Sequence, residues 1–562
     1  MSDLMRPIKF GDMMERVLEE YSKYNTVYSI ENIHKNEKEE RLNIFGLKLE
    51  SPVGAAAGPN TQLAHNIVAC YFAGMRFMEL KTVQIMEGEE LGIPKPCIRA
   101  EDEAYNVEWS TELDILVAAD EYIKAYFACK VFAKEFELGD PEGFVFNMSV
   151  GYDLKGIKSP KVDKFIETLK DGSKSSMWQE CEDYLLNNLD KFDKIDEKFI
   201  KSINKDFVNS ITLSTMHGCP PEEIEQIASY LIEEKHLNTY IKLNPTLLGY
   251  DRAREILDSM GYDYIKFGKE GFDNDLKFDD ALALIKRLRE KADKLNLAFG
   301  VKLTNTFQVD IKQNELPGEN MYMSGKSLYP LTINVAYELS KAFDGDLPIS
   351  FSGGADKNNI KEIFEAGIYP ITVATVLLKP KGLDNGASLA KLVEECEYPQ
   401  AQHTDTQKLK ELCDKVLEDK KYQKSEAQKK KYAKKDYHGA KDDDHRCRVL
   451  CQSCVRVCPN RCNEVVDLGD EKIIVHMDQI CNECGNCQFF CVEPCRPFKD
   501  RFTIFENEEA FNDSENDGYT KVDERYLFRF QNQTDTLKKE ELPEEVKKII
   551  EAIENTKAYL TK

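Results

Sequence analysis

Short, almost continuously apolar runs alternate with longer amphipathic stretches from about residue 50 to residue 380. Continuous apolarity is typical of parallel strands, because such strands are buried on both faces of a sheet. The longer stretches carry apolar residues at helical spacing, as in 221–235, where Ile224, Ile227 and Leu231 fall on one helix face. The apolar runs cover residues 53–58, 76–83, 144–150, 210–216, 239–245, 298–305, 348–354 and 371–378.

Eight strand candidates with intervening helices predict an α/β fold, a (β/α)8 or TIM barrel, over residues 51–390. A doubly wound sheet is the main alternative, but no G-x-G-x-x-G follows any of the runs. Residues 1–50 are expected to form a helical and extended segment that packs on the barrel. The lysine-rich residues 391–445 are expected to form a charged, partly helical linker. Residues 446–505 carry most of the cysteines, and 506–562 are expected to be a tail with a helix.

Composition and charge exclude several classes of partner. Acidic residues outnumber basic ones 100 to 76, which gives a net charge of -24. Nucleic acid and anionic membranes both require a cationic surface, so neither is expected as a main partner. No apolar run reaches the 18 or more residues of a membrane span, and the first residues do not resemble a signal peptide. We therefore expect a cytoplasmic protein.

The cysteines are concentrated in one segment. Ten of the 17 lie between Cys447 and Cys495, whereas a disulfide scaffold would distribute them through a short secreted chain. One half of the segment has the spacing C-x2-C-x2-C-x3-C of bacterial ferredoxins, and the other half has C-x3-C-x2-C-x3-C-P. Residues 471–479 between the halves supply a strand. The spacing predicts a small α+β domain, similar to bacterial ferredoxins, with two [4Fe–4S] clusters.

In ferredoxins of this type, the fourth cysteine of each run ligates the other cluster. One predicted set is therefore Cys447, Cys451, Cys454 and Cys491, and the other is Cys481, Cys484, Cys487 and Cys458. Cys462 and Cys495 are left over, and either could replace Cys458 or Cys491. Paired structural zinc sites are the alternative, although zinc seldom uses two interleaved sets of four thiolates. Two clusters carry single electrons, so they imply a two-electron centre, usually a flavin.

Polar side chains recur at the carboxyl ends of the predicted strands, where barrel enzymes place their active sites. These residues are Lys81, Thr82, Asn147, Ser149, Ser214, Thr215, Lys242, Asn244, Thr304, Asn305 and Thr306. The last two strands end in Ser352-Gly353-Gly354 and in Ala374-Thr375, and Gly325 precedes them. Barrels commonly bind a cofactor phosphate at this position, on backbone N–H groups that glycine leaves accessible.

Several stretches resemble known flavin barrels. They include AAAGPNTQLAHNIV (55–68), FMELKTVQI (77–85), FNMSVGYDLKGI (146–157), TLSTMHGCPPEEIE (212–225), YIKLNPTLLGYD (240–251), GVKLTNT (300–306), MYMSGKSLYPL (321–331), ISFSGGAD (349–356), CVRVCPNR (454–461) and CNECGNC (481–487). The barrel resembles those of dihydroorotate and dihydropyrimidine dehydrogenases. More closely, the chain is similar to the selenate reductase iron–sulfur subunit family of the YgfK type.

This resemblance implies FMN across the barrel mouth. Ala56, Ala57 and Gly58 would pack beside the isoalloxazine, and Lys81, Thr82 and Lys242 would lie near its polar edge. Gly325, Ser352, Gly353, Gly354, Ala374 and Thr375 would hold the phosphate, and Thr304 is grouped with these cofactor contacts. Asn147, Asn244, Asn305 and Thr306 correspond to positions where related barrels hydrogen-bond a flat pyrimidine ring.

The sequence departs from the dihydropyrimidine dehydrogenase pattern in two places. Longer family members carry an FAD- and pyridine-nucleotide-binding module between barrel and clusters, and residues 385–445 are too few to hold one. Dihydropyrimidine dehydrogenases also place a catalytic cysteine where this chain has Thr215. A hydroxyl has a high pKa and needs a relay, so Ser214, His217 and Cys219 are further candidates for the proton donor. A position before a helix N-terminus would lower the pKa of Cys219.

Two functions follow from these residues. The first is an oxidoreductase of dihydropyrimidine or dihydroorotate dehydrogenase type, which acts on CH–CH or ring C=C or C=N bonds of a purine or pyrimidine derivative, as in purine catabolism. The second is an electron-transfer subunit whose partner performs the substrate chemistry. Both require a separate redox protein, for which an FAD/NAD(P) flavoprotein, a ferredoxin and a molybdenum hydroxylase are the candidates. A homodimer and a hetero-complex are both compatible with the sequence.

Overall fold

The computed structural model describes residues 5–86, 89–101, 103–215, 218–426, 446–493 and 495–561. Its centre is a closed barrel of eight parallel strands, each paired with the next along the chain until the last pairs with the first. The strands are β3 (Val53–Ala55), β4 (Phe77–Glu79), β7 (Val145–Val150), β8 (Ser210–Ser214), β9 (Asn238–Leu243), β10 (Phe299–Leu303), β13 (Ile349–Phe351) and β14 (Ile371–Val373). Seven of them lie within the predicted apolar runs, and β9 begins one residue before its run, so the predicted TIM barrel is confirmed.

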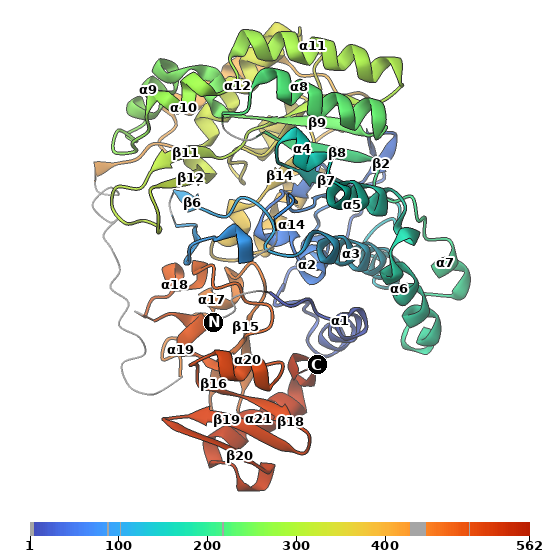
Figure 1. Ribbon diagram of the computed structural model, residues 1–562, viewed down its shortest axis with the longest axis vertical. Helices are drawn as coiled ribbons and strands as arrows, with labels where there is room; N and C mark the ends of the chain where they lie inside the picture. Colours follow the sequence, from blue (N-terminus) through green and yellow to red (C-terminus); the bar gives the residue numbers. More distant parts are fainter. Residues whose placement is uncertain are drawn as a thin grey trace.

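Helices surround the barrel, which occupies the upper part of Figure 1. Their apolar faces pack on the outer face of the strands, and side chains in the barrel interior bury the inner face, which explains the continuous apolarity of the runs. The helices are α2 (Ala64–Phe72), α3 (Ile115–Glu135), α4 (Leu154–Ile157), α5 (Pro160–Lys170), α6 (Ser176–Asn187), α7 (Glu197–Lys201), α8 (Pro221–Ser229), α9 (Tyr250–Ser259), α10 (Lys269–Asn274), α11 (Phe278–Lys294), α12 (Tyr329–Ala342), α13 (Ile360–Glu365), α14 (Asp384–Glu394) and α15 (Thr406–Glu418).

A second, four-stranded antiparallel sheet borders the mouth of the barrel. Its strands come from loops that follow β4 and β10, in the order β11 (Phe307–Asp310), β12 (Asn320–Ser324), β6 (Ala104–Asn106) and β5 (Ile98–Arg99). A separate hairpin, β1 (Leu42–Ile44) and β2 (Leu47–Leu49), precedes the barrel. The pattern of hydrophobic residues did not predict the four-stranded sheet.

The cysteine-bearing region continues into a six-stranded sheet, drawn in orange and red in Figure 1. Its strands are β15 (Asn463–Asp467), β16 (Lys472–Met477), β17 (Phe502–Ile504), β18 (Gly518–Val522), β19 (Arg525–Phe530) and β20 (Gln533–Leu537), and its helices are α17 (Ser453–Arg456), α18 (Asn486–Phe490), α19 (Pro497–Asp500), α20 (Glu508–Asp513) and α21 (Glu544–Thr556). The strand predicted at 471–479 is β16. Residues 506–562, expected to be a tail with a helix, contain α21 but also three strands of this sheet, because tight turns at Asp523 and Asn532 pair them as hairpins.

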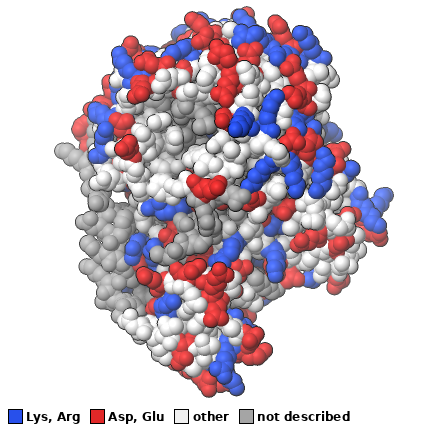
Figure 2. All heavy atoms as spheres, in the orientation of Figure 1, with Lys and Arg blue, Asp and Glu red and all other residues white. Residues whose placement is uncertain are grey.

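Two further segments pack on these units. Helix α1 (Phe10–Tyr24) contacts both the barrel and the six-stranded sheet: Phe10 contacts Phe127 on α3, and the buried guanidinium of Arg16 lies 3.2 Å from Glu464 on β15. Helix α15, from the segment expected to be a linker, packs against α12. On the face drawn in Figure 2, acidic and basic side chains are interspersed. Within the described ranges, no helix combines the length and the apolarity that crossing a membrane would require.

Candidate functional site

A cavity of about 580 Å³ opens where the carboxyl ends of the barrel strands meet the four-stranded sheet. This volume lies within the range of pockets that bind cofactors and small molecules. Its lysines are Lys81, Lys242, Lys326 and Lys379, and its carboxylates are Glu108 and Asp356. Lysines therefore outnumber carboxylates in a chain that is acidic overall. The cavity favours a ligand that carries negative charge.

Most of the residues predicted at the strand ends line this one cavity. They are Ala56, Ala57, Gly58, Lys81, Thr82, Ser214, Thr215, Lys242, Thr304, Asn305, Thr306, Gly325, Ser352, Gly354, Ala374 and Thr375. Their convergence follows from the barrel, because parallel strands in a closed sheet end at the same rim. Gly353, Asn147, Asn244 and Cys219 do not line it, and His217 lies outside the described residues.

Lys242 is the charged group in the cavity that other side chains leave uncompensated. Among the described residues, its ammonium has neither an ion-pair nor a hydrogen-bond partner. Burial, together with the positive charge of Lys81, lowers the pKa of Lys242 to about 8. Its register partner on β10, Lys302, is more deeply buried and forms an ion pair with Glu79. Of these two lysines, Lys242 is the half-buried one that lines the cavity, and it has no anion beside it among the described residues.

The end of the cavity predicted to hold a phosphate is built from close backbone contacts. Gly325 and Gly354 both adopt positive φ, of 76° and 85°. A Cβ atom on Gly354 would lie 2.2 Å from the carbonyl oxygen of Gly325, so the two backbones can approach only because residue 354 is glycine. Gly353 has another role. Its missing Cβ makes room for Thr332 of α12, and it therefore serves helix packing and not the cavity wall.

The asparagines predicted to contact a substrate separate into two groups. Asn305 lines the cavity, and its amide donates to the side chain of Asn244 at 2.7 Å. Asn244 lies behind it and donates to Asp275 at 3.1 Å, so it positions Asn305. Asn147 lies within β7, not after it, and its amide donates to Thr212 on the next strand at 2.9 Å. The prediction that Asn147 and Asn244 face a ligand directly is therefore not supported by the cavity.

The candidate proton donors also differ in position. Thr215 lines the cavity, and its hydroxyl donates to the carbonyl oxygen of Lys242 at 2.7 Å. Ser214 lines it as well and lies 3.4 Å from the Asn305 oxygen. Cys219 lies away from the cavity, 3.9 Å from a carboxylate oxygen of Glu223. Burial and the charge of Glu223 raise the pKa of the Cys219 thiol to about 11, which is opposite to the expected effect of the helix N-terminus. Of these candidates, Thr215 and Ser214 lie where a ligand would be.

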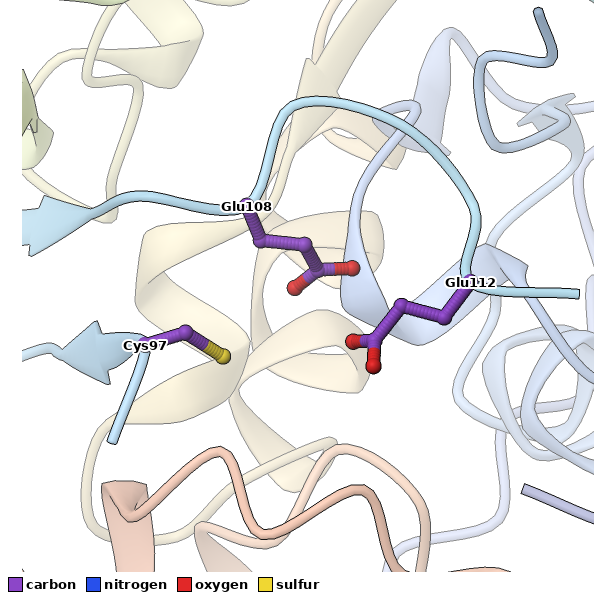
Figure 3. Close-up of side chains that lie close together, drawn as sticks. All are labelled: Cys97, Glu108 and Glu112. Atoms are coloured by element: carbon purple, nitrogen blue, oxygen red, sulfur yellow. The ribbon is translucent and has the colours of Figure 1, made fainter. Parts of the chain in front are cut away.

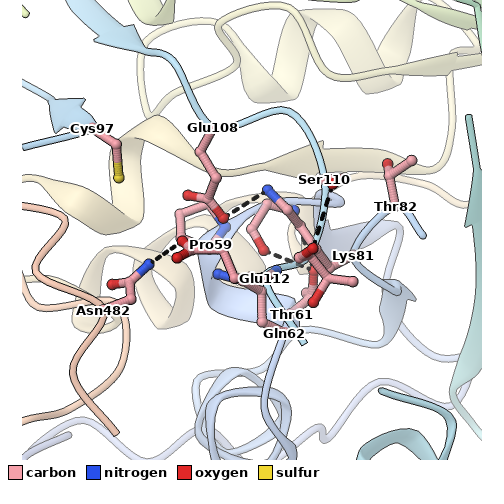
Figure 4. Close-up of polar contacts among 12 residues, drawn as sticks. Pro59, Thr61, Gln62, Lys81, Thr82, Cys97, Glu108, Ser110, Glu112 and Asn482 are labelled. Atoms are coloured by element: carbon pink, nitrogen blue, oxygen red, sulfur yellow. Dashed lines mark hydrogen bonds and ion pairs between the residues drawn. The ribbon is translucent and has the colours of Figure 1, made fainter. Parts of the chain in front are cut away.

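Sequence reasoning missed the loop that connects β6 to α3. Glu108 lines the cavity, and its carboxylate lies 3.0 Å from the ammonium of Lys81 (Figure 4). Trp109, the next residue, lines the cavity with 39% of its surface exposed. Both come from a segment without any periodic pattern. The one signal in the sequence that could have drawn attention to this loop was Trp109 itself, since the chain has only two tryptophans.

Behind this loop, Cys97, Glu108 and Glu112 converge in a buried group, with one potential ligand atom of each within 4.8 Å of the others (Figure 3). Such a group could in principle hold a cation. However, Lys81 lies 3.0 Å from Glu108, and Lys95 lies 2.7 Å from Glu112. Two ammonium groups already neutralise the two carboxylates, so the arrangement favours an ion-pair network over a metal site.

The thiols of the first predicted set lie close together near the surface. Burial raises the pKa of the Cys454 thiol, and the neighbouring thiols Cys491, Cys447 and Cys451 raise it further. The backbone N–H of Leu450 donates to the Cys447 sulfur at 3.2 Å, from a residue with φ of 45°. Cys451 is exposed, whereas Cys495 lies 3.2 Å from the Cys491 sulfur. This set is thus the outer one.

The second set surrounds a small internal cavity. Five thiols line it, namely Cys458, Cys462, Cys481, Cys484 and Cys487. The backbone N–H groups of Cys462 and Glu483 donate to the Cys458 and Cys481 sulfurs at 3.4 and 3.3 Å. Left-handed backbone at Arg461, Glu483 and Gly485 turns the loops around this cavity. N–H groups directed at sulfur stabilise thiolates, which is the form that binds metal.

The inner thiol set lies directly behind the wall of the barrel cavity. The backbone N–H groups of Cys97 and Ile98 both donate to the carbonyl oxygen of Cys484, at 3.0 and 2.9 Å. Ile98, on β5, lines the barrel cavity. Asn482 donates to Glu112 at 2.7 Å, which joins the same loop to the network in Figure 4. One strand therefore separates the cavity from Cys484, a member of the inner set.

Comparisons with known proteins agree with this architecture. The family described as "Oxidoreductase YgfK, N-terminal TIM-barrel domain" matches residues 28–424. Proteins named "Putative oxidoreductase YgfK" from Escherichia coli K12 and from Escherichia coli O157:H7 are each 47% identical over 427 residues. That alignment covers 73% of this chain but 41% of each relative, so the chain spans less than half the length of the relatives that it matches. With the family match extending over the whole barrel, the chain belongs to the YgfK oxidoreductase family.

Proposed function

We propose that the protein is an iron–sulfur flavoprotein in which FMN occupies the barrel cavity and two [4Fe–4S] clusters occupy the two thiol sets. Electrons would pass between the clusters and the flavin. Hydride would pass between the flavin and a conjugated nitrogen heterocycle, a purine or pyrimidine derivative, at a CH–CH, C=C or C=N bond. The observation that carries this proposal is that one strand separates the cavity from Cys484 of the inner thiol set.

Features of the cavity other than its volume support FMN. Lys242 lacks an anion, and a flavin that becomes negatively charged on reduction would supply one. Gly325 and Gly354 allow a phosphate to approach the backbone, and Lys326 lines the cavity with them. Ala56 and Gly58, which follow β3, add small side chains to the cavity wall. When bound, FMN supplies two-electron hydride chemistry, and these residues bind and orient it.

The chemistry of the thiols supports the clusters. The two groups of sulfurs match the two ligand sets expected from the spacing, and N–H donors from the backbone lie against three of the sulfurs. When bound, iron–sulfur clusters supply single-electron transfer. Cys462 and Cys495 adjoin the inner and the outer set, and either could serve as a ligand in place of Cys458 or Cys491.

The exposed position of Cys451 supports electron exchange with a separate redox protein at the outer set. A ferredoxin, an FAD/NAD(P) flavoprotein and a molybdenum hydroxylase remain the candidate classes. The relatives are more than twice as long as the matched region. Membership of the family therefore does not establish a redox partner for this chain, and the partner is part of the proposal. We propose that the chain acts in the cytoplasm, as a homodimer or within a hetero-complex.

On the substrate side, the cavity offers hydrogen-bonding groups suited to a ring with donors and acceptors. Asn305 is held by Asn244, and Thr306 lies beside it in the wall. Thr215 and Ser214 are the hydroxyls placed to hold a proton at this end. Because the Thr215 proton is bonded to the carbonyl oxygen of Lys242, its delivery to a substrate requires rotation of the hydroxyl or a relay through water.

The first test is the anaerobically purified protein. We expect a flavin spectrum that denaturation releases as FMN, with about eight iron and eight sulfide per chain. The reduced protein is then mixed with uracil, thymine, hypoxanthine and xanthine in the absence of any partner. Reoxidation of the flavin by one of them supports the proposed activity. Flavin and clusters without any reoxidation would instead favour the electron-transfer subunit, and absence of flavin would refute both.

A further inference from the structure

Trp109 is the residue of the cavity whose placement the fold itself does not explain. From Glu103 to Leu116, every other described side chain is buried or half-buried, whereas Trp109 exposes 39% of its surface. Its indole makes no ring contact and no hydrogen bond with any residue that the structure describes. An exposed aromatic side chain inside a cavity leaves a large apolar surface in water, which burial by a ligand would relieve.

The loop that carries Trp109 is fixed on both sides of it. Glu108 pairs with Lys81 at 3.0 Å, and the Thr111 N–H donates to the carbonyl oxygen of Thr82 at 2.9 Å. The next residue, Glu112, is held by Lys95 and also by Asn482 (Figure 4, for Asn482). These contacts hold the backbone so that it cannot turn the indole into the core. Trp109 is therefore presented in advance, which lowers the entropic cost of binding a ligand against it.

We propose that Trp109 is the stacking platform of the substrate subsite, and that this subsite takes a flat heterocyclic base with an imide or amide edge. This inference rests on the proposed function and specifies its substrate class. An indole face stacks on any flat π-system, and hydrogen bonds from the cavity wall select among such rings. Asn305 and Thr306 supply those bonds, and the Glu108–Lys81 pair sets the position of the indole.

The two tryptophans make the inference directly measurable. Trp178, the other one, is 8% exposed, packs against Phe127 at 4.5 Å between ring centroids, and does not line the cavity. Tryptophan emission of the oxidised holoprotein is followed while uracil or hypoxanthine is added. We expect saturable quenching in the wild type and in Trp178→Phe, and none in Trp109→Phe. Succinimide, which has an imide edge but no aromatic ring, should quench far more weakly.

Binding and turnover give a readout that does not depend on tryptophan emission. Equilibrium dialysis of Trp109→Ala should show about 10- to 100-fold weaker binding of the same base, the range expected for loss of one stacking contact. In steady state, KM should rise by a similar factor while kcat changes little, because stacking acts on bound substrate and transition state alike. The flavin-to-protein ratio of this variant reports whether the cavity is still folded.

The outcomes separate this inference from the proposed function. If a base reoxidises the flavin but Trp109→Ala binds it as tightly as the wild type, the stacking assignment is wrong and the proposed function stands. If the base binds and quenches Trp178→Phe but never reoxidises the flavin, the subsite stands and the proposed reaction fails. If no base at millimolar concentration binds the flavin-loaded wild type, the inference is refuted together with its substrate class.

Discussion

Replacing Lys242 by methionine should stabilise the flavin-free protein while impairing flavin binding. Lys242 is a cation inside the barrel mouth with no anion next to it among the described residues, and burial lowers its pKa from 10.5 to about 8. A folded-state pKa below the unfolded one means that the unfolded chain binds more protons between these two values. Stability must therefore increase as the pH rises from about 8 to about 10.5. At neutral pH, the buried charge opposes folding.

The magnitude follows from the pKa difference. The lowering of the Lys242 pKa from 10.5 to about 8 corresponds to roughly 3 kcal/mol of opposition to folding at pH 7, and to roughly 1.4 kcal/mol at pH 9.5. Methionine fills a similar volume without the charge, so Lys242→Met should gain about 3 kcal/mol at pH 7. For a barrel of this size, that is a rise in Tm of about 5 °C, and less than half of it should remain at pH 9.5.

The assay is thermal unfolding of flavin-free wild type and variant at one scan rate, at pH 7.0 and at pH 9.5. Lys242→Arg keeps the charge and should show no gain. Lys302→Met is the matched control on the neighbouring strand. It leaves the Glu79 carboxylate buried without its partner, so it should lose roughly 3–5 kcal/mol. A Tm of Lys242→Met that is lower than the wild type at pH 7, or a gain that does not depend on pH, would refute the reasoning.

Three further changes test other parts of the site. Gly354→Ala forces a Cβ against the Gly325 carbonyl at positive φ, at a cost of about 1–3 kcal/mol, and should lower the FMN-to-protein ratio after gel filtration; an unchanged ratio would argue against a phosphate there. Cys484→Ser should lower the iron content from about eight to about four per chain, whereas Cys495→Ser should leave it unchanged; equal losses would reassign the ligands. Thr215→Val should slow flavin reoxidation by a base about 100-fold or more, with flavin content retained, whereas Cys219→Ala should not slow it; the reverse result would make Cys219 the donor.

The barrel was predictable because its physical requirement is local. A strand that is covered by helices on one side and by the barrel interior on the other must be apolar throughout, and each of the eight runs shows this directly. The four-stranded sheet at the mouth was not predictable, because its strands are two to five residues long and come from segments around residues 98, 105, 308 and 322. Only the closed barrel brings those segments together, so no window of sequence contains the signal.

The prediction of the site succeeded and failed for the same reasons as the prediction of the fold. Asn147 lies three residues before the end of β7, whereas Asn305 lies two residues after the end of β10. This difference in position decides whether the amide bonds a neighbouring strand or faces the cavity. The Lys81–Glu108 pair could not be inferred either, because nothing in the sequence relates a strand end to a loop beyond the next two strands.

The two residues that the fold leaves unsatisfied in the cavity point to the same ligand arrangement. Lys242 has no anion beside it among the described residues, and Trp109 exposes 39% of its surface. Each feature costs folding free energy, and natural sequences retain such costs chiefly where function requires them. An anionic cofactor would remove the cost at Lys242, and a flat ring would remove the cost at Trp109. Occupancy of both should therefore stabilise the barrel, by about 2.7 kcal/mol for each ligand supplied at 100 times its Kd.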